Sequence, residues 1–387
     1  MDEFAFREDA VIAAARQATG LSDFGGDEFR EGLRRLLETY EISAGLSDRG
    51  RRMNWRRVVQ VLATRLRICE ALKRHPEIRA RPIRKPVYII GLPRTGTSAL
   101  FNLLALDPAA RPLLLWEGEC PDPALGLLPG QPDPRYLEIK ARYERSREKN
   151  PELAKIHFVD ADTPEECVLL TAHSFCDAQL GFEVLLEPYR SWFVEQDLRP
   201  TYRYYADLLR MLDWQRPGER WLLKSPAHLW AIDSLVELFP DACIVFTHRN
   251  PLEAVGSYCS MMATLMASRG CTAPPDLGET VLEYLALSLE RGLAARDRAK
   301  PERFLDVSYD RFVVEPMETV RRVYEHFELR LASETAGRMQ ENVHTNPGRK
   351  LGAHTYGLEE YGLTPERVKQ RLAAYIDRFA LPTDEDA

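Results

Sequence analysis

Apolar residues recur at helical spacing through the first eighty positions of the chain, with polar residues between them. Two segments, 28–40 and 55–72, each place their apolar side chains on one face of a helix. These side chains are Phe29, Leu33, Leu36, Leu37 and Tyr40 in the first segment, and Trp55, Val59, Leu62, Leu66 and Leu72 in the second. His75 and Pro76 end the second helix, whose arginines we interpret as a solvated face. Residues 1–85 are therefore predicted to form a helical cap and not an independent domain.

From residue 86 onward the pattern changes to short apolar runs that alternate with amphipathic segments. The runs predict strands at 87–90, 221–223, 243–247 and 304–307. The amphipathic segments predict helices at 135–148, 164–176, 202–214, 231–239, 252–266 and 313–327. Such alternation is typical of an α/β fold with a central parallel sheet flanked by helices.

We expect residues 86–387 to form this α/β domain. Within it, residues 120–215 are predicted to be a helical insertion that carries a substrate pocket, and residues 340–387 a C-terminal loop and helix. In sheets of this kind, ligands bind beyond the carboxyl ends of the strands.

The segment 86–107, PVYIIGLPRTGTSALFNLLALD, reads as a strand, a turn and a helix that opens at Thr97 or Ser98. The unpaired N–H groups of a helix N-terminus after such a turn bind anions. Gly91 and Gly96 stand where a nucleotide P-loop has glycines, but Thr97 replaces its lysine. The cation of this loop is instead Arg94.

Because the protein is acidic overall, any anion site must be a local basic pocket. The net charge of −7 and the pI near 5.8 argue against a general nucleic-acid surface. The seven cysteines show no metal-ligand spacing, and they favour a reducing compartment. The chain has no hydrophobic signal region and no long apolar run, so we expect a cytoplasmic protein without integral membrane contact. We also expect no metal and a possible homodimer.

Two further strand ends carry polar residues. The run CIVFTHRNPLEAVGSY ends a strand at His248–Arg249, and Ser257 follows Arg249 by eight positions. An arginine and a hydroxyl so placed can hold one phosphate. The run RWLLKSPAHLW ends a strand at Lys224, with His228 in the loop after it.

Together these pieces resemble the cofactor site of sulfotransferases that use 3′-phosphoadenosine 5′-phosphosulfate (PAPS). The match comprises a P-R-x-G-T-S loop, a strand-end lysine with a nearby histidine, an R-x₇-S element and a strand-end tyrosine–acid pair, Tyr309–Asp310. The GLPRTGTS, LKSP and THR-x-P elements and the tail from His354 to Leu363 are similar to a mycobacterial branch of that family.

The resemblance implies transfer of a sulfuryl group from PAPS to a hydroxyl on a small molecule, lipid or sugar, without a metal and with 3′-phosphoadenosine 5′-phosphate (PAP) as product. The loop residues implied in 5′-phosphosulfate binding are Pro93, Arg94, Thr95, Gly96, Thr97 and Ser98. Arg94, backed by Lys224, would stabilise the bridging oxygen as the S–O bond breaks. Arg249 and Ser257 would bind the 3′-phosphate, Tyr309 would lie near the adenine, and Arg349 and Lys350 would close over the phosphate.

The general base stays open between two residues. Glu117, 23 positions after Arg94, matches the catalytic glutamate of sugar sulfotransferases and is favoured. His228 lies near the position of the histidine in the small-molecule enzymes, with a different spacing from Lys224. Glu165–Glu166 reads as a helix start with Thr163 as N-cap and Pro164 in the first turn.

Two other functions stay open from the residues alone. One is a P-loop kinase or NTPase. Thr97 argues against it, because this threonine stands where the P-loop motif has its phosphate-binding lysine. The other is a non-catalytic nucleotide-binding protein that keeps the fold.

Overall fold

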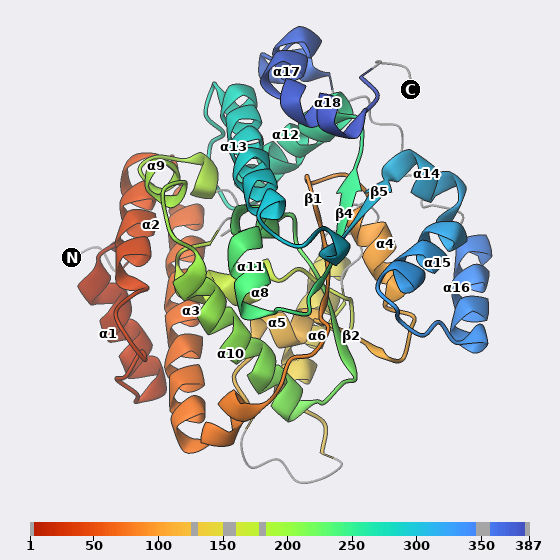
Figure 1. Cartoon of the computed structure of the whole chain (residues 1–387). Helices are drawn as coiled ribbons and strands as arrows, with labels where there is room; N and C mark the ends of the chain where they lie inside the picture. Colours follow the sequence, from red (N-terminus) through yellow and green to blue (C-terminus); the bar gives the residue numbers. More distant parts are fainter. Residues whose placement is uncertain (1–3, 125–130, 150–159, 178–182, 346–356, 384–387) are drawn as a thin grey trace.

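The centre of the molecule is a five-stranded, entirely parallel sheet (Figure 1). This computed structural model describes residues 4–124, 131–149, 160–177, 183–345 and 357–383. The strands are β1 (Val87–Gly91), β2 (Ala110–Pro112), β3 (Arg220–Lys224), β4 (Cys243–His248) and β5 (Phe304–Ser308). They lie in the order β2-β3-β1-β4-β5, so β1 is central and its neighbours are β3 and β4. The predicted α/β fold with a parallel sheet is confirmed.

Alternate residues of the buried strands enter two hydrophobic cores, as the period of two requires. Val87 and Ile89 of β1 face a core that contains residues of α4, α15 and α16. Tyr88 and Ile90 face a larger core, shared with α10, α11, α12 and α13 and with the N-terminal helices.

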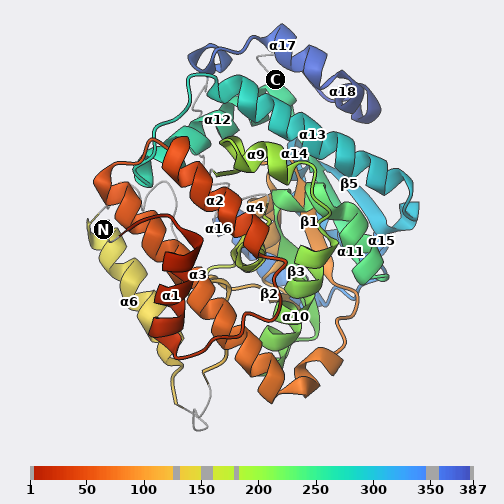
Figure 2. The ribbon, with the colours of Figure 1, turned by 90° about the vertical axis from the view of Figure 1, so that its left-hand side faces the viewer.

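The N-terminal helices form an outer layer over this larger core (Figure 2). They are α1 (Glu8–Thr19), α2 (Arg30–Ile42) and α3 (Asp48–Arg74). Helix α3 begins at an N-cap, Ser47, whose hydroxyl accepts from the backbone N–H of Gly50, and it ends just before His75 and Pro76. Because α1–α3 share a core with the sheet, they pack as part of the same body.

The remaining helices connect and cover the strands. Before β5 these are α4 (Thr97–Leu104), α5 (Leu115–Glu119), α6 (Pro134–Lys149), α8 (Val168–Thr171), α9 (Tyr189–Phe193), α10 (Arg199–Gln215), α11 (Ile232–Leu238), α12 (Pro251–Ser268) and α13 (Leu277–Asp297). After β5 they are α14 (Tyr309–Val314), α15 (Pro316–His326), α16 (Ser333–Thr345), α17 (Pro365–Arg371) and α18 (Ala373–Phe379). Short 3₁₀ turns include η4 (Pro226–Ala231), directly after β3. None of the helices described is both long and apolar enough to cross a bilayer.

The structure differs from the sequence prediction at several elements, among them α13, which was not predicted. Strand β2 was not predicted, because it is three residues long, ends in a proline and lies at the sheet edge, where a missing N–H is tolerated. The predicted helix 313–327 is two helices, divided at Glu315–Pro316. The predicted helix 164–176 is wrong at its start: Pro164 forms an isolated β-bridge with Leu114, and α8 begins at Val168.

Candidate anion site at the carboxyl edge of the sheet

The turn between β1 and α4 is held in a conformation that requires two glycines. Gly91 has φ +143° and Gly96 has φ +83°. A Cβ on Gly91 would lie 2.5 Å from the carbonyl oxygen of Thr247 on β4. Gly96 is the N-cap of α4, so the chain turns sharply into the helix and its first N–H groups face the turn.

Some hydroxyl groups of the turn bond within the protein, and others are exposed to a ligand. The Thr95 hydroxyl donates to the Leu92 carbonyl at 2.7 Å and also contacts the Thr247 hydroxyl at 2.7 Å, so it holds the loop together and is not free for a ligand. Thr97 is buried at the first position of α4, whereas Ser98 is exposed. The ligand contacts open to this turn are therefore backbone N–H groups and the Ser98 hydroxyl.

Replacing Gly96 with alanine is expected to destabilise the fold by about 1–2 kcal/mol, the cost of a left-handed conformation for an L-residue. The added Cβ would also lie 2.6 Å from Cδ2 of Tyr309, whose ring covers the turn. Urea unfolding measures the change. Gly337→Ala in α16 is the control: nothing lies within 4 Å of its Cβ position, so it should leave stability unchanged or slightly raised. Equal stability of G96A and wild type would contradict this account.

On the β4 side of the turn, two arginines and Ser257 connect the loop to α12. The Arg94 Nε donates to the Ser257 hydroxyl at 2.9 Å. The Arg249 Nη1 donates to the Arg94 carbonyl at 3.1 Å, and its guanidinium lies 4.3 Å from the centre of the Tyr309 ring. Arg249 also pairs with Glu253, one turn into α12. Arg94, Arg249, Ser257 and Tyr309, predicted separately, thus lie together.

On the β3 side of the turn lies Lys224, the last residue of β3. Its side chain is only 4% exposed, and its Nζ lies 3.1 Å from the Ser98 hydroxyl. The Nζ also donates to Glu166 Oε1 at 2.6 Å, while the Ser225 hydroxyl contacts the other carboxylate oxygen at 3.3 Å. Glu166 is thus a site residue that the sequence analysis did not identify. Nothing local indicates its role, since Lys224 is 58 positions away.

Glu117, the favoured base, belongs to a separate network of ion pairs and hydrogen bonds. Its carboxylate is 1% exposed and accepts from Arg111 at 2.9 Å, from Arg216 at 3.0 Å and from the Leu114 N–H at 3.1 Å. These contacts join β2, the segment before β3 and α5, so the carboxylate holds the structure together.

His228 is also enclosed, which corrects the alternative. It is 1% exposed, its Nδ1 lies 2.6 Å from the Tyr202 hydroxyl, and the Tyr88 ring packs against it edge to face. Burial lowers the pKa of His228 to about 3, so the imidazole stays neutral. It belongs to the core beneath the sheet. Arg349 and Lys350 lie outside the described residues.

An apolar crevice lies close to the end of β3 in the chain, since Pro226 and Ala227 line it. Its volume is about 10 Å³, roughly the room for one water. It is lined by Pro93, Pro226, Ala227, Leu229, Trp230, Tyr258, Tyr284, Leu285 and Ser288. Burial, together with the negative charge of Glu166, raises the pKa of Tyr258. Pro93 connects the crevice to the anion loop.

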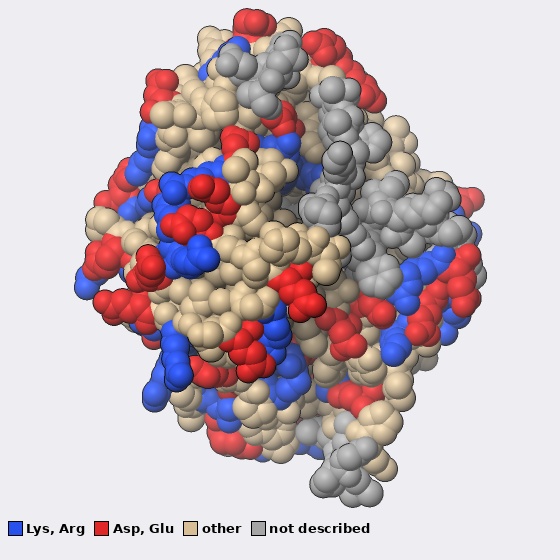
Figure 3. All heavy atoms as spheres, turned by 90° about the vertical axis from the view of Figure 1, so that its right-hand side faces the viewer, with Lys and Arg blue, Asp and Glu red and all other residues tan. Residues whose placement is uncertain are grey.

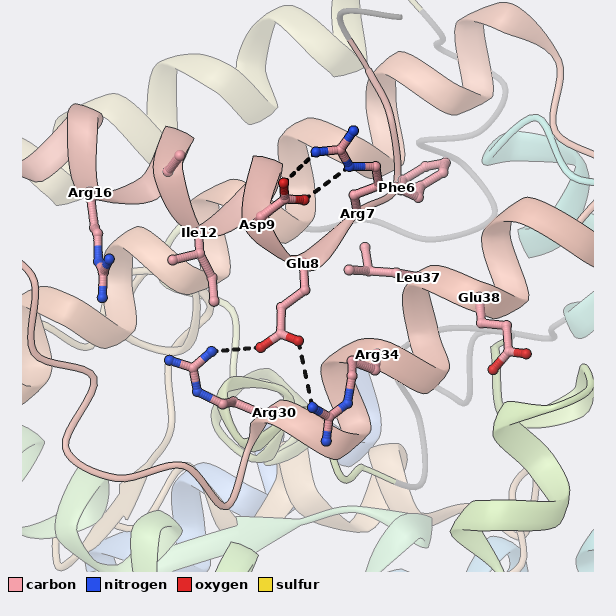
Figure 4. Close-up of a pocket in the computed structure, with 11 residues that line it drawn as sticks. Phe6, Arg7, Glu8, Asp9, Ile12, Arg16, Arg30, Arg34, Leu37 and Glu38 are labelled. Carbon is pink, nitrogen blue, oxygen red and sulfur yellow. Dashed lines mark hydrogen bonds and ion pairs between the residues drawn. The ribbon is translucent and has the colours of Figure 1, made fainter.

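A larger hollow, of about 750 Å³, lies between α1 and α2 on the far side of the molecule from α4 (Figures 1 and 4). Figure 4 shows Glu8 at its centre, 2.6 Å from Arg30 and 3.7 Å from Arg34. Arg30 and Arg34 in this hollow are thus already paired with an acid. On the face seen in Figure 3, acidic and basic side chains are likewise interspersed among the described residues.

A parallel sheet with a glycine-bearing anion turn after its central strand, and a basic residue at the end of each neighbouring strand, defines a P-loop-like α/β transferase. The chain belongs to the sulfotransferase family: the family model described as "Sulfotransferase family" matches residues 86–333.

Known relatives agree with this assignment. The chain is 32% identical to crystalline sulfotransferase STF1 from Mycobacterium tuberculosis H37Rv, covering 96% of this chain and 100% of that one with a TM-score of 0.83. It is 31% identical to STF9 from Mycobacterium avium, covering 97% of each chain with a TM-score of 0.87. It is also 25% identical to the omega-hydroxy-beta-dihydromenaquinone-9 sulfotransferase Stf3 of Mycobacterium bovis and Mycobacterium tuberculosis, over 76% of this chain and 74% of the relative. The predicted membership in the mycobacterial branch is confirmed.

Proposed function

We propose that this sulfotransferase takes its sulfuryl group from PAPS and transfers it to a hydroxyl on an apolar acceptor. One observation carries the proposal: basic side chains from β3 and β4 flank the anion turn on both sides. Lys224 and Arg249 follow strands on opposite sides of β1, and they contact different parts of the turn, the Ser98 hydroxyl and the Arg94 carbonyl. Two separated cations fit a donor that has charged groups at both its 5′ and 3′ positions.

In this proposal the turn holds the 5′-phosphosulfate. The N–H groups at the start of α4 and the Ser98 hydroxyl donate to its oxygens. Lys224, buried and 3.1 Å from that hydroxyl, supplies positive charge where the bridging oxygen gains electrons. Arg94, from the same turn, adds a second positive charge on the side of α12.

Arg249 holds the 3′-phosphate in this proposal, with Ser257 beside it. The Arg249 Nε is buried and has no hydrogen-bond partner among the described residues, so a donor is available for an incoming oxygen. Glu253 occupies part of the guanidinium at present and would be displaced by the phosphate. Tyr309, stacked on the guanidinium, fixes its plane.

Glu166 is our proposed general base. Its carboxylate lies at the Lys224 ammonium, and Pro226, two positions after Lys224, lines the crevice that starts at Pro93. The acceptor hydroxyl would have to reach the carboxylate on the side of the sulfur opposite the bridging oxygen. In-line transfer requires the acceptor oxygen and its base on the side opposite the leaving phosphate.

The acceptor is proposed to be apolar near its hydroxyl. The crevice is lined by proline, leucine and aromatic side chains, which bury hydrocarbon and not sugar hydroxyls. The Stf3 relatives act on a hydroxylated menaquinone derivative, which is consistent with an apolar acceptor here. A cytoplasmic location, a homodimer and the domain division at residue 86 stay predictions.

Thermal unfolding with ligands tests the donor. PAP without metal is expected to stabilise the protein by about 2.7 kcal/mol at a hundred times its Kd, and ATP with Mg²⁺ to have little effect. Arg249→Ala should remove most of the PAP shift. Stabilisation by ATP with Mg²⁺ alone would favour a kinase instead. Binding of PAP without sulfate transfer from PAPS to a panel of alcohols and phenols would favour a non-catalytic nucleotide-binding protein.

A further inference from the structure

The residue before Arg249 is anchored on the C-terminal helices. His248 ends β4, and its backbone lies beside Ser308 of β5. Its Nδ1 lies 2.9 Å from the Tyr375 hydroxyl of α18, and its Nε2 lies 2.9 Å from Asp306 Oδ1. The Phe379 ring stacks on the imidazole, with centroids 4.0 Å apart. Every polar atom of this side chain is thus engaged.

The hydrogen-bond directions in this cluster follow from chemistry. Arg296 donates to both oxygens of Asp306, at 2.6 Å and 2.7 Å, which keeps Asp306 ionised and lowers its pKa. Burial lowers the pKa of His248, so the ring is neutral and carries one N–H. An ionised carboxylate only accepts, so Nε2–H donates to Asp306 and Nδ1 accepts from Tyr375. Asp306 therefore fixes the tautomer, and the Tyr375 hydroxyl donates to the remaining ring nitrogen.

Tyr375 is itself held by a series of ion pairs between the C-terminal helices and α13. Arg371 of α17 contacts Glu283 at 2.7 Å and Glu290 at 2.6 Å. Arg378 of α18 contacts Asp297 at 2.6 Å. The docked position of α18, and with it the Tyr375 hydroxyl, is set by a helix that belongs to the body of the domain.

We infer that Tyr375 and His248 are positioning residues that hold the end of β4 so that the Arg249 guanidinium meets the 3′-phosphate of the donor. The inference rests on the proposed function, in which Arg249 binds that phosphate. Arg249 follows His248 by one peptide bond, so a rotation of the strand end moves both side chains. The contacts of Arg249 itself are few, and the pair with Glu253 is lost when a phosphate takes its place.

Tyr375→Phe tests the inference because it removes one hydroxyl and keeps the ring. Isothermal titration gives the Kd of PAP and the Kd of adenosine 5′-monophosphate (AMP), which lacks the 3′-phosphate. We expect the ratio Kd(AMP)/Kd(PAP) to fall about threefold to tenfold in Y375F, with the Kd of AMP unchanged. Arg249→Ala should remove most of the preference for PAP, so that the ratio falls toward one.

Tyr324→Phe is the matched control. Tyr324 is 4% exposed, and its hydroxyl donates to Asp107 at 2.7 Å on the other face of the sheet. Its loss should leave the ratio as in wild type. Asp306→Asn, which removes the acceptor for Nε2–H, provides a second variant and should lower the ratio in the same way.

Three outcomes separate the possibilities. A wild-type protein that binds PAP no more tightly than AMP contradicts the proposed donor site, whatever Tyr375 does. A wild-type protein that discriminates, with Y375F and D306N at the same ratio, overturns the positioning role. Equal weakening of PAP and AMP in Y375F overturns it also, because that result indicates general loosening.

Discussion

Changing Glu166 to glutamine is expected to lower kcat by about 10²–10⁴-fold while leaving the Kd of PAP within about twofold. The substitution keeps the size of the side chain and one carbonyl oxygen that can accept from Lys224, so the pair at 2.6 Å can persist as a hydrogen bond. A primary amide cannot take up the acceptor's proton. Turnover should therefore fall because the chemical step is slowed, with the donor still bound.

Sulfate transfer from PAPS to an apolar alcohol or phenol measures the effect, with PAP titration on the same samples. Glu166→Asp should recover part of the activity, since it restores the carboxylate at a shorter reach. A full kcat in E166Q would remove Glu166 from the mechanism. A loss of PAP affinity that matches the loss of turnover would instead indicate that Glu166 only orients Lys224.

The same substitution at Glu117 is expected to act on stability: Glu117→Gln should lower the free energy of unfolding by about 3–5 kcal/mol. Two arginines depend on this carboxylate, and Arg111 is only 3% exposed. Burial lowers the pKa of Arg111 to about 10, and Glu117 opposes that shift. The neutral amide would leave a buried guanidinium without a compensating charge.

Urea unfolding at constant protein concentration measures the loss for E117Q, and kcat per folded molecule should stay near the wild-type value. E166Q and E117Q make the same chemical change, but the first is expected to lower turnover and the second to lower stability. If E117Q were as stable as wild type yet inactive, Glu117 would regain the role of base that the sequence suggested.

The sequence was informative where a residue's role follows from its own neighbours in the chain. The turn at 91–98 and the strand ends at Lys224 and Arg249 are local patterns, and parallel strands bring their carboxyl ends to one edge. The proximity of Arg94 to Arg249 and Ser257 could be expected on that ground, whereas the place of Tyr309 was implied by the family resemblance. Their contacts in the structure agree with it.

The proposed base, Glu166, could not be found in this way because its environment is made by distant residues. Glu117 has the expected spacing from Arg94, but Arg216, 99 positions later, pairs with it at the start of β3. The short edge strand β2, whose proline argues against a strand, sets where that segment lies. Glu166 looked like part of a helix start, but the bridge between Pro164 and Leu114 and the hydrogen bond from the Cys167 N–H to the Lys224 carbonyl hold this segment beside Lys224.

Adjacent positions on helix α12 have different surroundings. Ser257 contacts Arg94 beside the anion turn, while Tyr258 lines the apolar crevice. Successive residues of a helix point about 100° apart, so in the proposed function this one helix would separate the donor from the acceptor. Under this proposal, mutations at Tyr258 or on the α13 side of the crevice would change which alcohol is accepted and leave the contacts between Arg94 and Ser257 unchanged. Related enzymes of this kind could therefore diversify their acceptors one residue at a time without rebuilding the donor site.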